Sequence, residues 1–86
     1  MPLRGSAVEW GPDGVRVNAV APGWVMSSGF DTYDDPETRK RFSEMPNYVP
    51  LKRIGTEAEL SAAIAFLLSP AASFITGSSI RVDGGV

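Results

Sequence analysis

Two short strands that flank one apolar helix constrain this chain more than any other feature of its sequence. Residues 15–21 are rich in β-branched side chains and lie between turn residues, which predicts a strand. Residues 79–83 follow Gly77 and predict a second strand before the Gly84-Gly85 pair. A strand–helix–strand order predicts a βαβ unit with a right-handed crossover and parallel strands. We therefore expect an α/β fold.

The helix between the strands has a clear start signal and an apolar face. Thr56 and Glu59 stand three residues apart, so each side chain can bond the other's backbone amide in a capping box. Ala62 and Phe66 widen the apolar face, which predicts burial on two sides of a helix over residues 57–68. The main apolar stripe recurs at helical spacing at Leu60, Ala63, Ile64, Leu67 and Leu68.

Two further helices are expected outside this unit. Residues 1–10 fit the tail of a helix, and residues 11–14 (Gly-Pro-Asp-Gly) give a strong turn signal after it. Residues 35–37 (Asp-Pro-Glu) are typical of a helix start, with proline at the first helical position and acids in the first turn. Pro46 is expected to end that helix near Met45.

The predicted sheet lacks neighbours within this sequence. A parallel sheet is normally covered on both faces. The strand over residues 15–21 is expected to turn Val20 to one face and its other apolar residues to the opposite face. One crossover helix covers a single face and leaves strand edges unpaired. We therefore expect residues 1–86 to form a single partial domain at the edge of a larger α/β sheet.

Composition excludes several kinds of site. The chain has no cysteine and no histidine, which excludes disulfides and thiolate metal sites and removes the commonest metal ligand. A net charge of −2 gives no basic field for nucleic acid or an anionic membrane, and the basic run 39–41 lies among acidic residues. No signal peptide or membrane-spanning run is visible, so we expect a cytoplasmic protein without a metal, nucleic-acid or membrane partner.

Several motifs, in order, resemble the C-terminal portion of the short-chain dehydrogenase/reductase family. Residues 14–23 (GVRVNAVAPG) resemble the segment after the active-site helix of that family, and residues 50–55 (PLKRIG) resemble a later segment. Residues 73–77 (SFITG) and 80–85 (IRVDGG) resemble the family's closing strand. The resemblance implies the C-terminal part of a Rossmann-type doubly wound parallel sheet, namely its last two strands and the crossover helix.

The resemblance also implies a nicotinamide cofactor, NAD or NADP. In this family the loop after the Pro-Gly turn touches the nicotinamide end. Mapped here, Pro22 and Gly23 shape the approach, and backbone groups of Val25 meet the carboxamide. Ser27 stands where the family usually has threonine, and its hydroxyl can keep the same hydrogen bond. Without the resemblance, Pro22-Gly23 is an ordinary turn that ends a strand, and Ser27 is an ordinary loop serine.

Residues 24–49 resemble the family's substrate loop, inserted before the crossover helix. Trp24 and Met26 suit a hydrophobic substrate but fit equally well as anchors of the loop in the core. The chain is similar to trans-2-enoyl-CoA reductases and to citronellol/citronellal dehydrogenases, which leaves enoyl reduction and alcohol oxidation both open. The residues of this loop expected to line a substrate pocket are Trp24, Met26, Phe30 and Tyr33.

The residues that perform the family's chemistry are not recognisable in this sequence. A pyrophosphate needs a glycine-rich turn before a helix, whereas strand residues follow the 11–14 turn. The family's catalytic serine and its tyrosine–lysine pair should precede Val15. Tyr48 and Lys52 match the Tyr-x-x-x-Lys spacing, but Pro50 would break the helix that such a pair needs. We expect no catalytic residue and no tightly bound cofactor in this chain alone.

Two functions remain open at this stage. The first is part of an NAD(P)-dependent oxidoreductase, inactive alone. The second is a non-catalytic interaction or oligomerisation module derived from the same fold. The resemblance implies a homo-oligomer through helix 57–68 and strand 79–83, because these elements often form subunit interfaces in the family. Arg53 and Asp83 are expected to hold structure rather than bind substrate.

Overall fold

The structure is a computed structural model and describes residues 2–26 and 35–86. Its helices and strands follow one another along the chain as α1 (Leu3–Trp10), η1 (Gly11–Asp13), β1 (Ala19–Pro22), β2 (Val25–Met26), α2 (Pro36–Glu44), η3 (Met45–Tyr48), β3 (Gly55–Thr56), α3 (Glu57–Leu68), η4 (Pro70–Ala72) and β4 (Ser79–Val82), where η marks a short 3₁₀ helix.

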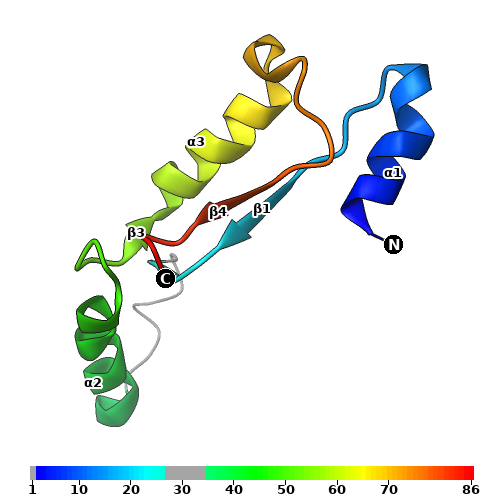
Figure 1. Cartoon of the computed structure of the whole chain (residues 1–86). Helices are drawn as coiled ribbons and strands as arrows, with labels where there is room; N and C mark the ends of the chain where they lie inside the picture. Colours follow the sequence, from blue (N-terminus) through cyan, green and yellow to red (C-terminus); the bar gives the residue numbers. More distant parts are fainter. Residues whose placement is uncertain (1, 27–34) are drawn as a thin grey trace.

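The centre of the fold is a pair of parallel strands with one helix between them in sequence. β1 pairs with β4 in register from Ala19 opposite Ser79 to Pro22 opposite Val82. The chain leaves β1, reaches α3 through the residues in between, and returns as β4 alongside β1 (Figure 1). α3 packs on both strands. These observations confirm the predicted α/β class and the parallel strand–helix–strand order.

The capping box predicted from Thr56 and Glu59 sets the start of α3. The Glu59 amide donates to the Thr56 hydroxyl at 3.1 Å, and the Thr56 amide donates to the Glu59 carboxylate at 3.0 Å. The helix ends at Leu68, and Pro70 opens the short helix η4 directly after it. Both predicted ends of this helix are therefore confirmed.

The first strand begins later and ends later than predicted. Residues 15–18 lie outside β1. The Val17 carbonyl still accepts from the Gly77 amide at 2.7 Å, but side chains supply the neighbouring bonds: the Val17 amide donates to the Thr76 hydroxyl, and the Asn18 side chain bonds the opposite segment. Pro22 was predicted to follow the strand, but it is the last residue within it. The amides of Ala19 and Gly23 donate toward β4, so the nitrogen of Pro22 points away and no hydrogen bond is lost.

Smaller differences occur at the other elements. β4 ends at Val82, one residue earlier than predicted, because Asp83 turns to accept a hydrogen bond from the Gly85 amide at 2.9 Å. The helix predicted from residues 35–37 is α2, with the Asp35 carboxylate accepting from the Glu37 amide. The short parallel pair β2–β3 was not predicted, because two residues in each strand show no sequence period.

The prediction that α3 is buried on two sides is wrong. Leu67 is buried between the helix and the strands, but Phe66 is 43% exposed and Leu68 is 77% exposed. The β1–β4 pair offers this helix a single face, so Leu60 and Ala63 are half-buried and the remaining apolar side chains of α3 are exposed.

The chain is elongated and has a small core. Its radius of gyration is 16.5 Å and its extents are 52 × 25 × 25 Å. A compact domain of this length would have a radius of gyration of about 12 Å. Among the described residues, the buried apolar side chains are Ala7, Val49, Leu67 and Ala72. The elements therefore share little apolar contact, and α1 and α2 lie at opposite ends of the molecule (Figure 1).

Candidate functional site

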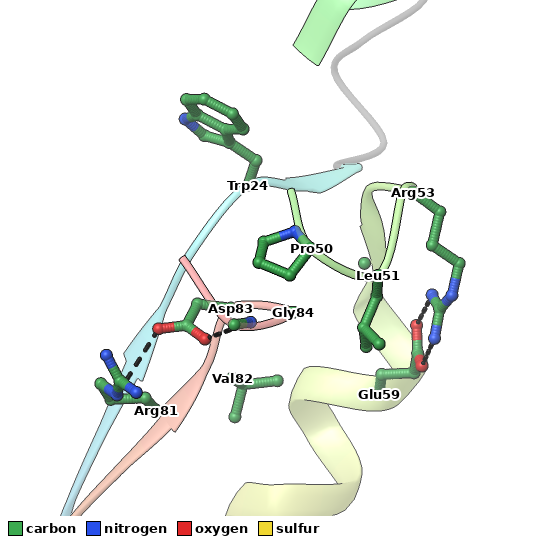
Figure 2. Close-up of a pocket in the computed structure, with 11 residues that line it drawn as sticks. Trp24, Pro50, Leu51, Arg53, Glu59, Arg81, Val82, Asp83 and Gly84 are labelled. Carbon is green, nitrogen blue, oxygen red and sulfur yellow. Dashed lines mark hydrogen bonds and ion pairs between the residues drawn. The ribbon is translucent and has the colours of Figure 1, made fainter. Parts of the chain in front are cut away.

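A cleft lies where the carboxyl ends of β1 and β4 meet the segment after residue 49 (Figure 2). Its volume is about 520 Å³. In parallel α/β sheets, ligands bind outside the carboxyl ends of the strands, so this edge is the first place to look for a site. The cleft is lined by Trp24, Pro50, Leu51, Arg53, Gly55, Glu59, Arg81, Val82, Asp83, Gly84 and Gly85.

Gly23 lets the chain leave β1 in close contact with the end of β4. Its amide donates to the Val82 carbonyl at 2.9 Å. A Cβ atom added to Gly23 would lie 2.7 Å from the Asp83 Cβ and 2.8 Å from the Asp83 Cα, which is closer than such atoms can approach. The absence of a side chain at Gly23 is therefore required for the path of the chain into β2.

Pro50 and Leu51 form the floor of the cleft, and the turn at Gly84 packs against them. The Leu51 amide donates to the Gly84 carbonyl at 3.2 Å, and Val49 is only 3% exposed. Gly84 has φ +68°, and a Cβ there would lie 2.6 Å from a methyl carbon of Val49. Pro50 and Leu51 consequently lie against the end of β4, as Figure 2 shows.

A wall of the cleft is formed by Trp24 and Gly55, where the short pair β2–β3 begins. Val25 pairs with Gly55 and Met26 with Thr56, and the Gly55 amide donates to the Trp24 carbonyl at 3.0 Å. Val25 is half-buried, whereas Trp24 and Met26 are exposed. Two exposed apolar side chains therefore flank a backbone segment that is held in an extended conformation.

An ion pair at the start of α3 closes one side of the cleft. Arg53 contacts both carboxylate oxygens of Glu59, at 2.7 Å and 2.5 Å. The hydrogen bond from Arg53, followed by that from the Thr56 amide, lowers the pKa of Glu59 from 4.5 to about 2. Arg53 and Asp83 thus bond within the chain, since Asp83 accepts from the Gly85 amide and lies 3.7 Å from the Arg81 guanidinium. Both charges therefore have partners within the chain, as expected of residues that hold structure.

Asn18 is a structural residue that was missed in the sequence. Its side-chain amide donates to the Ile75 carbonyl at 2.9 Å, and its oxygen accepts from the Ser78 amide at 3.0 Å. The sequence did contain a signal for this role. Asparagine is depleted in strands, and a buried asparagine side chain there needs hydrogen-bond partners. Asn18 therefore ties the approach to β1 to the approach to β4.

The residues predicted to meet the cofactor and substrate fall on one segment as far as they are described. Pro22, Gly23, Trp24, Val25 and Met26 follow one another along the carboxyl edge of the sheet. Trp24 lines the main cleft, and Met26 lines a second cleft beside α2. The remaining predicted residues, Ser27, Phe30 and Tyr33, lie outside the described part of the chain.

Tyr48 and Lys52 do not form a helical pair. Tyr48 ends η3 and is 70% exposed, and the chain then becomes extended at Val49. Lys52 has φ 60°, and its ammonium donates to the Asn47 carbonyl at 3.1 Å. The Tyr-x-x-x-Lys match therefore lacks the helix that would place both side chains on one face.

Within residues 2–26 and 35–86, no group of three or more acidic side chains could hold a metal ion, and none of the helices could span a bilayer.

The comparisons with known proteins agree on one family. The profile of a family described as enoyl-(acyl carrier protein) reductase matches residues 2–86. Galactitol 2-dehydrogenase (L-tagatose-forming) of Cereibacter sphaeroides is 44% identical over 82 residues, covering 95% of this chain and 32% of that protein. A peroxisomal 2,4-dienoyl-CoA reductase of Danio rerio is 45% identical over 84 residues, covering 92% of this chain and 26% of that protein.

Solved structures show the same likeness in three dimensions. A citronellol catabolism dehydrogenase of Pseudomonas aeruginosa PAO1 is 54% identical with a TM-score of 0.70, over 95% of this chain and 28% of that one. An NADPH-bound short-chain oxidoreductase of the same organism is 35% identical with a TM-score of 0.83, over 98% of this chain and 34% of that one. The chain thus spans about a third of the length of the relatives that it matches, and it belongs to the short-chain dehydrogenase/reductase family.

Proposed function

We propose that this chain forms the nicotinamide- and substrate-facing edge of an NAD(P)-dependent oxidoreductase. The observation that carries the proposal is the cleft at the carboxyl ends of β1 and β4, beside the extended segment 22–26. Ligands of Rossmann-type sheets bind at this edge. The cofactor would supply hydride transfer to or from the substrate, and the residues of this chain would orient both partners.

The segment after β1 fits the nicotinamide end of such a cofactor. The Val25 backbone would meet the carboxamide, while Pro22 and Gly23 set the path of the chain and the Ser27 hydroxyl adds a hydrogen bond. A neutral carboxamide needs backbone donors and acceptors rather than charge. The pairing of β2 with β3 supports this role, because it holds the segment extended before any ligand binds.

The N-termini of α2 and α3 do not fit the pyrophosphate of a dinucleotide, and the N-terminus of α1, which has no side-chain cap, follows Pro2 rather than a glycine. Helix N-termini bind phosphate through free amides and the positive end of the helix dipole. At α2 the Asp35 carboxylate occupies this position, and at α3 the Glu59 carboxylate does. Gly14, at φ +78°, precedes non-helical residues rather than a helix. We therefore propose that this chain alone binds no dinucleotide tightly and carries no catalytic residue.

A hydrophobic substrate is the proposed partner of Trp24 and Met26. Both side chains are exposed beside the clefts, where apolar groups of a substrate would cover them. Phe30 and Tyr33 are proposed to extend this surface within the 24–49 loop. Among the similar proteins, one is named for a dienoyl-CoA and one for citronellol, whereas another is named for the polyol galactitol. An alcohol, carbonyl or enoyl compound with an apolar chain fits this proposal.

A second role, association between copies, is favoured by the apolar side chains that α3 leaves exposed. Ile64, Phe66 and Leu68 are all exposed, and Phe74 after η4 is fully exposed. Exposed apolar patches of this kind mark interaction surfaces. We propose that copies of the chain associate through α3 and β4, with or without an enzymatic role of the assembled protein.

The direct test of the enzymatic proposal combines turnover with contact mapping. The chain is expected to show no NAD(P)H consumption above blank with alcohols, ketones and enoyl thioesters. At millimolar NADH, amide shifts in nuclear magnetic resonance should concentrate on residues 23–26. Turnover that Tyr48→Phe abolishes would overturn the proposal that the chain lacks a catalytic residue. Shifts absent from residues 23–26 would overturn the nicotinamide contact.

A further inference from the structure

The Arg53–Glu59 ion pair lies between α3 and the wall of the cleft. We propose that Arg53 is a positioning residue, which fixes the β3 strand on α3 and thereby fixes where the Trp24–Met26 segment lies. The significance of that segment for a cofactor rests on the proposed function. The mechanical link from Arg53 to Trp24 does not, and it can be tested separately.

Glu59 is the point at which the connections converge. Its carboxylate accepts from the two terminal guanidinium nitrogens of Arg53, at 2.7 Å and 2.5 Å, from the Thr56 amide at 3.0 Å and from the Thr56 hydroxyl at 3.1 Å. Arg53 lies two residues before β3, and Thr56 is the last residue of this strand. One side chain on α3 therefore holds both ends of the residues 53–56.

The link continues from β3 to the cleft wall through the backbone. The Gly55 amide donates to the Trp24 carbonyl at 3.0 Å, and Gly55 and Thr56 pair with Val25 and Met26. A pairing of two residues on each side has little stability of its own. Its position must therefore depend on what anchors β3, and the contacts to Glu59 supply that anchor.

The geometry of the pair is what makes this role specific. Isolated surface ion pairs usually contribute little, and the side chains of Arg53 and Glu59 are 53% and 42% exposed. A bidentate arginine–carboxylate contact adds directional constraint that a single charge contact lacks. We expect Arg53 to influence the position and mobility of β3 more than the overall stability of the chain.

Hydrogen exchange at single amides tests the link. Replacing Arg53 by glutamine should speed exchange of the Gly55 amide ~5-fold and leave unchanged the Glu59 amide, which donates to the Thr56 cap of α3. Thr56→Ala should instead speed exchange most at the Glu59 amide, because it removes the acceptor of that amide and spares the ion pair. Arg53→Lys should fall between wild type and Arg53→Gln, because it keeps the charge and loses the second contact.

Lys52→Gln is the matched control. It removes the same charge from the neighbouring residue, whose ammonium bonds the Asn47 carbonyl rather than Glu59. Exchange at Gly55 should remain at the wild-type rate in this variant. Equal exchange rates at Gly55 in wild type and Arg53→Gln, or an equal acceleration in Lys52→Gln, would overturn the positioning role.

Reduced nicotinamide mononucleotide separates this inference from the proposed function. In wild type this ligand should shift the resonance of the Val25 amide. In Arg53→Gln, the ligand concentration that gives half of the maximal shift should be ~3-fold higher or more. The same half-point in both proteins would overturn the positioning role. No shift at Val25 in wild type would overturn the nicotinamide contact, while the exchange result would still decide the role of Arg53.

Discussion

Gly23 is the residue on which the geometry of the carboxyl edge depends most. It separates β1 from β2, and the end of β4 fills the space where its side chain would be. The sequence indicated a turn at Pro22-Gly23, but the close approach to Asp83 could not be predicted. That contact joins residues 60 positions apart, and no local pattern encodes it.

Replacing Gly23 by alanine should destabilise the chain by about 1–3 kcal/mol, as overpacking of a tight contact does. The added methyl group would meet the backbone of Asp83, which cannot move without disturbing β4. Gly11→Ala is the control, because nothing lies within 4 Å of that position and its backbone is helical. Urea denaturation at one fixed protein concentration compares the two, and an equal midpoint for both variants would contradict the contact.

The stabilisation from Glu59 should depend on pH in a defined direction. Its pKa in the fold is about 2, below the ordinary value of 4.5, so the stabilisation is complete above pH 4.5 and is lost as the pH falls toward 2. The difference in urea midpoint between wild type and Glu59→Gln should be constant from about pH 7 to pH 5 and shrink below that. A difference in urea midpoint that grows as the pH falls would contradict the hydrogen bonds that the ionised Glu59 carboxylate accepts.

Among the elements, α3 was predicted to the residue and the strands were not. The capping box and Pro70 are local signals, and they specify where the helix begins and ends. The start of β1 was misplaced because the side chain of Asn18 replaces part of the backbone pairing there, through contacts across 57 and 60 positions of sequence. β2 and β3 depend on each other and on Glu59 for their position, so neither strand has a sequence pattern from which it could be predicted.

Two adjacent leucines of α3 should behave in opposite ways. Leu67→Asp places an unpaired charge in the core and should unfold the chain. Leu68→Asp alters a side chain that is 77% exposed and should leave the helix intact. If α3 forms the contact between copies, Leu68→Asp should also shift the chain toward monomer in sedimentation, with an unchanged circular dichroism spectrum. A wild-type chain that is monomeric at all concentrations would contradict the association proposal.

At the scale of the whole molecule, the family and the arrangement of elements are consistent, but the core is small. The fold class, the parallel strands and the order of the motifs were predictable from the sequence, and the family match over residues 2–86 confirms them. The prediction that α3 is covered on two sides was wrong because the described elements cover one side only. Substrate and cofactor contacts stay predictions, since Ser27, Phe30 and Tyr33 lie outside the described residues.

We propose that this chain presents a surface for the nicotinamide end of a cofactor and none for the pyrophosphate. Calorimetric titration with NADH, beside reduced nicotinamide mononucleotide, measures this directly. We expect both ligands to bind no more tightly than about millimolar, and with equal affinity, because the adenosine half makes no contact. Micromolar affinity for NADH with weak binding of the mononucleotide would contradict it, since the chain would then hold the pyrophosphate as well.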